Sequence, residues 1–109
     1  MDDCVFCKIV TGAIPTTFLF QNDDVMAFPD LHPKAPIHIL IVPKKHIQSL
    51  NQVTDGSIIV KMIDAAKQVA KDKGIYEKGY KLVINTGKEG GQVIRHFHLH
   101  LLGGTQLKG

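Results

Sequence analysis

Aromatic residues and long apolar runs are scarce in this sequence. Tryptophan is absent, aromatic residues occupy 6% of the 109 positions, and hydrophobic residues make up 44%. No stretch approaches the roughly 18–20 consecutive apolar residues of a membrane-spanning helix. The first three residues, Met-Asp-Asp, are acidic where a secretory signal peptide would be basic. We therefore predict a cytoplasmic protein with no membrane partner.

A strong excess of charge is also missing. The formal net charge is +3, and the lysines are scattered along the chain rather than clustered. Nucleic-acid-binding domains usually carry a concentrated basic patch. The composition therefore argues against a nucleic-acid partner and fits a small anion, such as a nucleotide, better.

Cysteine is limited to two residues, Cys4 and Cys7. This number excludes a disulfide-rich secreted domain and fits a reducing compartment. A single C-x-x-C motif leaves three interpretations open. The cysteines could be a redox pair at a helix start, two buried thiols, or two of the four ligands of a structural zinc ion.

The length predicts a single domain, residues 1–109. The hydrophobic pattern predicts an α+β fold, in which about five strands form a mainly antiparallel sheet with one long helix and a short N-terminal helix. Thr54 is the expected N-cap of the long helix, and Gly74 is its expected C-terminal stop. The predicted strands are 16–20, 25–28, 37–42 (the central strand), 80–85 and 96–102, and the predicted helices are 4–10 and 58–70.

Three of the six histidines follow one another at two-residue spacing, at His96, His98 and His100. On a strand, these imidazoles would project from one face at intervals of roughly 7 Å, and the apolar residues between them would face the core. Two of the histidines could hold a catalytic metal, or one imidazole could be a nucleophile that its neighbours orient. No acidic residue follows the triplet to complete a metal site, which favours the nucleophile.

The run from His96 to Leu102 matches the histidine triad signature, H-x-H-x-H with apolar residues at x. Nearly the whole chain resembles the nucleotide-binding (HINT) branch of the histidine triad family. The resemblance implies a HIT-like fold and a homodimer, for which we expect an interface of the long helix and the strand 80–85. It also implies hydrolysis of nucleoside 5′-phosphoramidates such as adenosine 5′-monophosphoramidate. The other matching segments are 6–10, 14–15, 27–30, 36–38, 41–47, 83–85 and 90–92.

The resemblance implies a role for each catalytic histidine. His98 would attack the α-phosphorus, and water would then hydrolyse the nucleotidyl-histidine to the nucleoside monophosphate. His100 would stabilise charge on the phosphate, and His38 would support and orient the nucleophile. His96 is the first member of the triad. No cofactor is implied for catalysis, and the expected ligand is a purine nucleotide: AMP, GMP or a phosphoramidate.

The remaining nucleotide contacts expected from the resemblance fall into three groups. Asp30 would accept hydrogen bonds from both ribose hydroxyls, as a carboxylate can. Apolar side chains would enclose the base, and the glycine-rich loop with the preceding asparagine would meet the phosphate. The expected base contacts are Ile9, Ile14, Phe28 and Leu31, and the expected phosphate contacts are Asn85, Gly91, Gln92 and Val93.

The resemblance also favours zinc for Cys4 and Cys7. Several microbial relatives that keep this motif bind zinc with it, together with the histidine of the Lys-Lys-His segment and the first triad histidine. In this sequence these are His46 and His96. The implied zinc is structural and attaches the N-terminal segment to the sheet. His32 is a weaker alternative ligand.

The sequence departs from its relatives at two places. Val93 stands where they commonly carry a serine, and the segment after Gly103 lacks the tryptophan-containing tail that reaches the partner subunit's site in many of them. Both departures predict a changed rate or leaving-group selectivity. The alternatives that stay open are a nucleotide-binding regulatory protein with weak or vestigial hydrolase activity, a dinucleoside polyphosphate hydrolase or nucleotidyltransferase, and a metal-dependent hydrolase.

Overall fold

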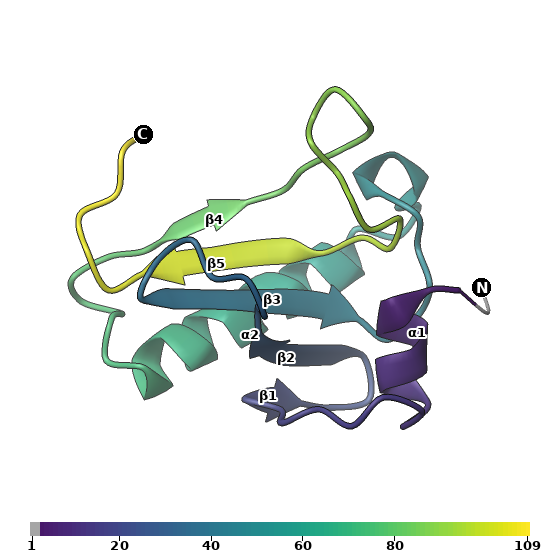
Figure 1. Cartoon of the computed structure of the whole chain (residues 1–109), viewed down its shortest axis with the longest axis horizontal. Helices are drawn as coiled ribbons and strands as arrows, with labels where there is room; N and C mark the ends of the chain where they lie inside the picture. Colours follow the sequence, from purple (N-terminus) through teal and green to yellow (C-terminus); the bar gives the residue numbers. More distant parts are fainter. Residues whose placement is uncertain (1–2) are drawn as a thin grey trace.

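The computed structural model describes residues 3–109, which form one antiparallel sheet of five strands and two α-helices (Figure 1). The strand order is β1-β2-β3-β5-β4, so the predicted α+β class and the central place of β3 are confirmed. The elements are α1 (Val5–Val10), β1 (Phe20–Gln21), β2 (Val25–Pro29), β3 (Ile37–Pro43), the 3-10 helix η1 (Leu50–Gln52), α2 (Ser57–Asp72), β4 (Lys81–Val83) and β5 (Leu99–Gly103).

The alternation of side chains along the strands gives the sheet two apolar faces. One face packs against α2, in a core that includes Ile39, Ile41 and Leu101. The opposite face packs against α1, which lies near the end of β3 in Figure 1. His38 is in the same phase of β3 as Leu40, so it projects from the α1 face. The side chains of this second core are Phe6, Ile9, Met26, Phe28, Leu40 and Val42.

The long helix starts differently from the prediction and ends as predicted. Thr54 is not the N-cap, because the helix begins later, at Ser57, whose N–H bonds to the Asp55 carboxylate at 3.0 Å. The N-cap position is Gly56, which has no side chain to cap the helix, so the Asp55 carboxylate satisfies one of the otherwise unpaired N–H groups of the first turn. At the other end, Gly74 adopts φ +73, and its N–H donates to the Lys71 carbonyl at 3.1 Å. A residue in this left-handed conformation terminates the helix.

The first predicted strand, residues 16–20, is mostly not a strand. Only Phe20–Gln21 pairs as β1, and the N–H of Leu19 extends the pairing to the carbonyl of Ala27 at 2.8 Å. Residues 15–17 instead line a cavity beside α1. The β-branched side chains of Thr16 and Thr17 favour a strand locally, but tertiary packing decides their conformation.

The predicted strand 96–102 begins three residues later than expected, as β5. His100 lies within it, whereas His96 and His98 precede it. The carbonyl of His96 accepts the Nδ1–H of His98 at 2.7 Å, and the N–H of Phe97 donates to the segment after β3 at 2.6 Å. These bonds take up backbone groups that a strand would use for its ladder, so residues 96–98 lie outside the regular alternation of β5.

The edge strand β4 is also shorter than the predicted strand 80–85. Tyr80 and Leu82 are partly buried, and Val60 on α2 is 61% exposed. Pairing of two copies through α2 and this edge stays a prediction. Among residues 3–109, neither helix combines the length and apolar character needed to cross a bilayer.

Replacing Gly74 with alanine should lower the free energy of unfolding by about 1 kcal/mol, because a Cβ disfavours the left-handed conformation. No neighbouring atom would clash with that Cβ, so the backbone supplies the whole effect. Urea unfolding followed by circular dichroism measures it. The matched control is Lys73→Ala, one residue earlier at φ −89, which should cost less than about 0.5 kcal/mol. Equal losses would contradict the assignment.

Candidate functional site

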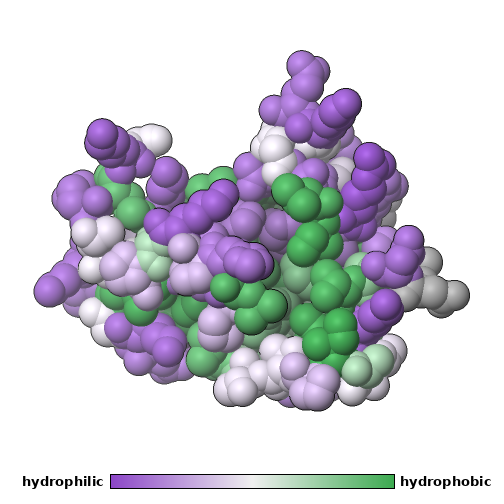
Figure 2. All heavy atoms as spheres, viewed as in Figure 1, coloured by the Kyte–Doolittle hydropathy of each residue, from purple (hydrophilic) through white to green (hydrophobic). Residues whose placement is uncertain are grey.

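A cavity of about 430 Å³ lies between α1 and the segments on either side of β2. It brings together all five side chains expected to hold the base and the ribose: Ile9, Ile14, Phe28, Asp30 and Leu31. The lining is mostly apolar, and Figure 2 shows a band of hydrophobic side chains beside a hollow on this side of the molecule. The cavity can enclose a flat apolar group and offers one carboxylate at its edge.

Two contacts connect this cavity to the histidines. Phe6 lines the cavity, and its ring meets the ring of His98 edge-on with the centroids 5.3 Å apart. Asp30 also lines the cavity, and its Oδ2 lies 3.5 Å from Nε2 of His38. A ligand in the cavity would therefore end beside the imidazoles.

His98 is buried, and one hydrogen bond fixes its tautomer. Its Nδ1 lies 2.7 Å from the carbonyl oxygen of His96. Because a carbonyl only accepts, Nδ1 carries the proton, and the neutral ring keeps its lone pair on Nε2. Burial lowers the pKa of His98 below its ordinary value of 6.5, so the imidazole stays neutral at pH 7. A neutral imidazole with a free Nε2 can act as a nucleophile.

A second chain of hydrogen bonds fixes the tautomer of His100. The backbone N–H of Lys34 donates to Nδ1 of His38 at 3.0 Å, so neutral His38 carries its proton on Nε2. That Nε2–H donates to Nδ1 of His100 at 2.9 Å. Neutral His100 then carries its proton on Nε2, where it can serve as a donor. The ring centroids of His98 and His100 lie 5.0 Å apart, so an imidazole with an unprotonated Nε2 lies beside one that can donate a hydrogen bond.

The glycine-rich loop before β5 is tied together by its own polar groups. The side chain of Asn85 donates to the carbonyl of Gly90 at 2.8 Å. The Gln92 side chain accepts from the N–H of Gly87 at 3.0 Å and donates to the carbonyls of Gln48 and Ile94. The backbone N–H groups of Gly91 and Gln92 also donate within the loop. These expected phosphate contacts therefore determine the shape of the loop.

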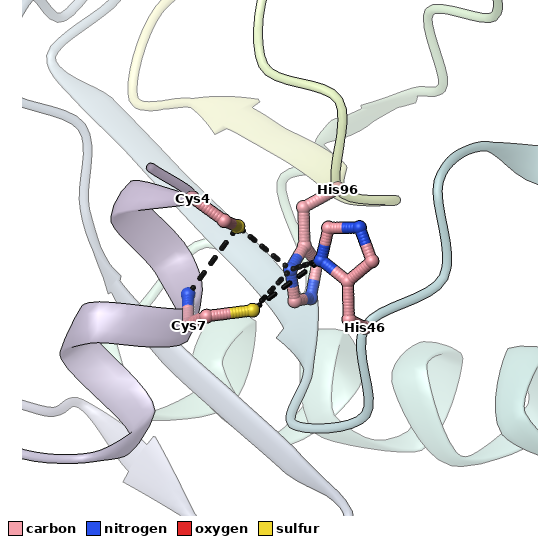
Figure 3. Close-up of side chains that lie close together, drawn as sticks. All are labelled: Cys4, Cys7, His46 and His96. Carbon is pink, nitrogen blue, oxygen red and sulfur yellow. Dashed lines mark hydrogen bonds between the residues drawn. The ribbon is translucent and has the colours of Figure 1, made fainter. Parts of the chain in front are cut away.

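The N-terminal cysteines meet two histidines in a compact cluster (Figure 3). The four potential ligand atoms of Cys4, Cys7, His46 and His96 all lie within 4.8 Å of one another. Nδ1 of His96 is 3.3 Å from Sγ of Cys4 and 3.2 Å from Nδ1 of His46, and Sγ of Cys7 is 3.3 Å from Nδ1 of His46. The structure thus brings together the four residues expected to bind zinc, and this cluster could hold a metal ion.

The geometry of this cluster fits a tetrahedral zinc ion. Zn–N and Zn–S bonds of about 2.0 and 2.3 Å place tetrahedral ligands roughly 3.3–3.8 Å apart, close to the separations of these atoms. Nε2 of His96 donates to the carbonyl of Pro43 at 2.8 Å, so the lone pair on Nδ1 faces the sulfur atoms. Burial and the neighbouring Cys4 raise the pKa of Cys7 to about 11. A bound cation would therefore displace a proton from this thiol.

A second group of potential ligands, Asp30, His38 and His100, fits a metal poorly. Its atoms are also within 4.8 Å of one another. However, Nδ1 of His38 accepts the Lys34 N–H, so neutral His38 has its lone pair on Nδ1 and its proton on Nε2. Nε2 is the nitrogen that faces Asp30 and His100. A protonated nitrogen has no lone pair for a cation. This arrangement argues against a catalytic metal at the histidines.

Several residues that line the cavity were not predicted from the sequence as contacts of the nucleotide, among them Phe6 and Ile94. Phe6 contacts His96 and His98 at centroid distances of 5.5 and 5.3 Å, and Ile94 lines the cavity. The position of Phe6 between the two cysteines could have predicted its place in the site, because a metal that binds Cys4 and Cys7 also fixes the backbone that carries this ring. Ile94 carried no such signal. The expected alternative ligand His32 lines the cavity and lies outside the cysteine cluster.

Known proteins match this chain over most of its length. Residues 11–107 match the family described as HIT domain. The purine nucleoside phosphoramidase of Escherichia coli K12 is 42% identical over 108 residues, which cover 97% of this chain and 91% of that protein. The family match begins after α1, so it includes His46 and His96 but not Cys4 and Cys7.

Solved structures share the fold. A HIT family hydrolase from Legionella pneumophila Philadelphia 1 superposes with a TM-score of 0.93 at 45% identity, covering 97% of this chain and 96% of that one. A histidine triad protein from Clostridium difficile gives a TM-score of 0.96 at 42% identity, covering 100% and 96%. These superpositions confirm the fold expected from the sequence.

Acid should destabilise the protein through His100. Burial and the neighbouring His98 and His38 lower the pKa of His100 to about 4, whereas the ordinary value is 6.5. Between these two values the unfolded chain binds more protons than the folded chain. The contribution of neutral His100 is therefore present above pH 6.5 and is lost as the pH falls towards 4.

Urea unfolding at pH 7.5, 6.0 and 5.0 tests this expectation. The midpoint should fall with pH, and His100→Gln should reduce the fall. The control variant His32→Gln changes an exposed imidazole and should keep the fall of the unmodified protein. An undiminished fall in His100→Gln would contradict the assignment. Because His100 lies outside the cysteine cluster, the comparison is independent of metal binding there.

Proposed function

Because the chain belongs to the HIT domain family, we propose that it hydrolyses purine nucleoside 5′-phosphoramidates through a nucleotidyl-histidine intermediate. The observation that carries the proposal is the tautomer of His98, whose unprotonated Nε2 lies beside a proton donor on His100 and next to an apolar cavity. The name of the Escherichia coli relative, purine nucleoside phosphoramidase, supports the substrate class.

The reaction has two steps. The lone pair on Nε2 of His98 forms a bond to the α-phosphorus, the P–N bond of the substrate breaks, and the leaving amine takes up a proton from water. Water then attacks the phosphorus and breaks the bond to His98, which releases the nucleoside monophosphate and a proton. In both steps the Nε2–H of His100 donates to a phosphate oxygen and stabilises its growing charge.

The nucleotide occupies the cavity beside α1 in this proposal. Asp30 accepts hydrogen bonds from the ribose hydroxyls, since its carboxylate has acceptor capacity beyond the bond from the His32 N–H at 2.8 Å. Ile9, Ile14 and Phe28 enclose the purine. The loop that contains Asn85 and residues 91–93 borders the phosphate, and the backbone N–H of Val93 replaces the hydroxyl that a serine would offer there.

We further propose that the cluster of Cys4, Cys7, His46 and His96 binds one structural zinc ion. The separations of the ligand atoms and the tautomer of His96 support this assignment. The ion would supply a crosslink between α1 and two distant segments of the chain. It supplies none of the bonds made or broken in the two reaction steps.

Replacing His98 with alanine should lower kcat for an adenosine phosphoramidate by about 10³-fold or more, because the covalent step loses its nucleophile. Release of AMP measured by chromatography gives the rate. The control variant Lys67→Ala changes an exposed side chain on α2 and should keep full activity. Full turnover by His98→Ala would exclude the mechanism.

A substrate panel separates this function from the alternatives. Phosphoramidates should be turned over faster than diadenosine polyphosphates, and the opposite preference would indicate a dinucleoside polyphosphate hydrolase. Purine nucleotide binding without turnover of any compound would indicate a regulatory protein with a vestigial site.

Elemental analysis of the purified protein should find about one zinc ion per chain, since four nitrogen and sulfur ligands complete a structural site. The double variant C4S/C7S should contain none. His32→Gln is the matched control, because this histidine lies outside the cluster, and it should keep its zinc. Equal zinc in the double variant and the unmodified protein would place the ion elsewhere.

A further inference from the structure

His96 belongs to the metal-ligand cluster through its ring and to the catalytic site through its backbone. Its ring is fully buried, with Nδ1 at 3.3 Å from Sγ of Cys4 and Nε2 bonded to the Pro43 carbonyl. Its own carbonyl is the acceptor that fixes the tautomer of His98, at 2.7 Å. Since ring and carbonyl are joined through the same Cα, restraining the ring also restrains the carbonyl.

We propose that Cys4, Cys7 and His46 are positioning residues for the hydrolytic reaction, acting through His96 on the nucleophile His98. The cluster holds the ring of His96, and the carbonyl of His96 then selects the Nδ1–H tautomer of His98 and leaves Nε2 unprotonated. This inference rests on the proposed function for its kinetic consequence. Its structural consequence, the tautomer of His98, is independent of any substrate.

The place of the nucleophile in the fold makes it depend on such a restraint. His96 and His98 precede β5, so no strand pairing holds the carbonyl of His96 in place. Among the described residues, three contacts hold this segment in place. The Phe97 N–H donates to the Ile47 carbonyl, the Nε2–H of His96 donates to the Pro43 carbonyl, and Nδ1 of His96 contacts Sγ of Cys4. A neutral imidazole exists as either tautomer, and the form with Nε2–H cannot attack phosphorus.

Phe6 provides a second connection between the cluster and the nucleophile. It lies on α1 between the two cysteines, is 2% exposed, and contacts the rings of both His96 and His98 edge-on. The helix has six residues, too few to be stable alone. Cys4 and Cys7 therefore hold the ring that packs against His98, and they hold one wall of the nucleotide cavity.

The test measures the tautomer of His98 without substrate. In ¹⁵N-histidine-labelled protein, long-range ¹H–¹⁵N spectra should show His98 as the pure Nδ1–H form. In C4S/C7S we expect a mixture of both tautomers and a fall in kcat of about 10-fold to 100-fold, the size of effect that small errors of alignment produce. The matched control is Val69→Ala, a core change on the α2 face, which should lower stability but leave the tautomer and kcat unchanged.

A pair of variants at His46 keeps the test decisive if C4S/C7S does not fold. His46→Ala removes one ligand, and His46→Cys keeps a ligand at the same position. The alanine variant should show the mixed tautomers and the lower kcat, and the cysteine variant should restore both towards the unmodified protein. Loss of zinc in His46→Ala with an unchanged His98 spectrum and unchanged kcat would overturn the inference.

Failure of the inference and failure of the proposed function give different results. If phosphoramidates are hydrolysed at the same rate with and without the cluster, the inference is wrong and the proposed function stands. If no phosphoramidate is hydrolysed but the tautomer of His98 still depends on the cluster, the proposed function is wrong and the structural link stands.

Discussion

The site depends on the hydrogen bond from the Nδ1–H of His98 to the carbonyl of His96. This bond determines which nitrogen of a buried imidazole is free, and it takes up a carbonyl that a strand would otherwise use for pairing. The orientation of the His98 imidazole and the beginning of β5 at Leu99 are therefore two results of one interaction. The free-energy cost of burying the His98 ring is small, because burial lowers its pKa and the ring is therefore buried without a charge.

The other histidines acquire different functions in the same way, from different backbone partners. The Pro43 carbonyl accepts the Nε2–H of His96, so the lone pair on Nδ1 of His96 faces the cysteines. The Lys34 N–H instead donates to Nδ1 of His38, which leaves the proton of His38 on Nε2. This Nε2–H donates to Nδ1 of His100, so neutral His100 carries its own proton on Nε2. Side chains of one chemical type thus present a lone pair at different ring nitrogens because each meets a different backbone group.

The sequence was sufficient to predict the central strand, the helix stop at Gly74 and the convergence of Cys4, Cys7, His46 and His96, because each follows from a local pattern or from the resemblance. It was insufficient where a tertiary contact outweighs a local preference. The β-branched segment at Thr16 lines a cavity instead of pairing, and the regular spacing of the histidines does not reveal that His98 bonds to a backbone carbonyl two residues before it. Phe6 was missed because its importance comes from partners about 90 positions away in the chain.

The strand order has a consequence for how the chain acquires this site during synthesis. β5 is the last strand in the sequence but lies between β3 and β4 in the sheet, and Cys4 and His96 are 92 positions apart. Neither the middle of the sheet nor the cluster can form until the segment from His96 to Gly103 has left the ribosome. Such long-range pairings are slow to form. The segment that contains His96 and His98 therefore reaches its final position only when residues about 90 positions apart in the chain come together.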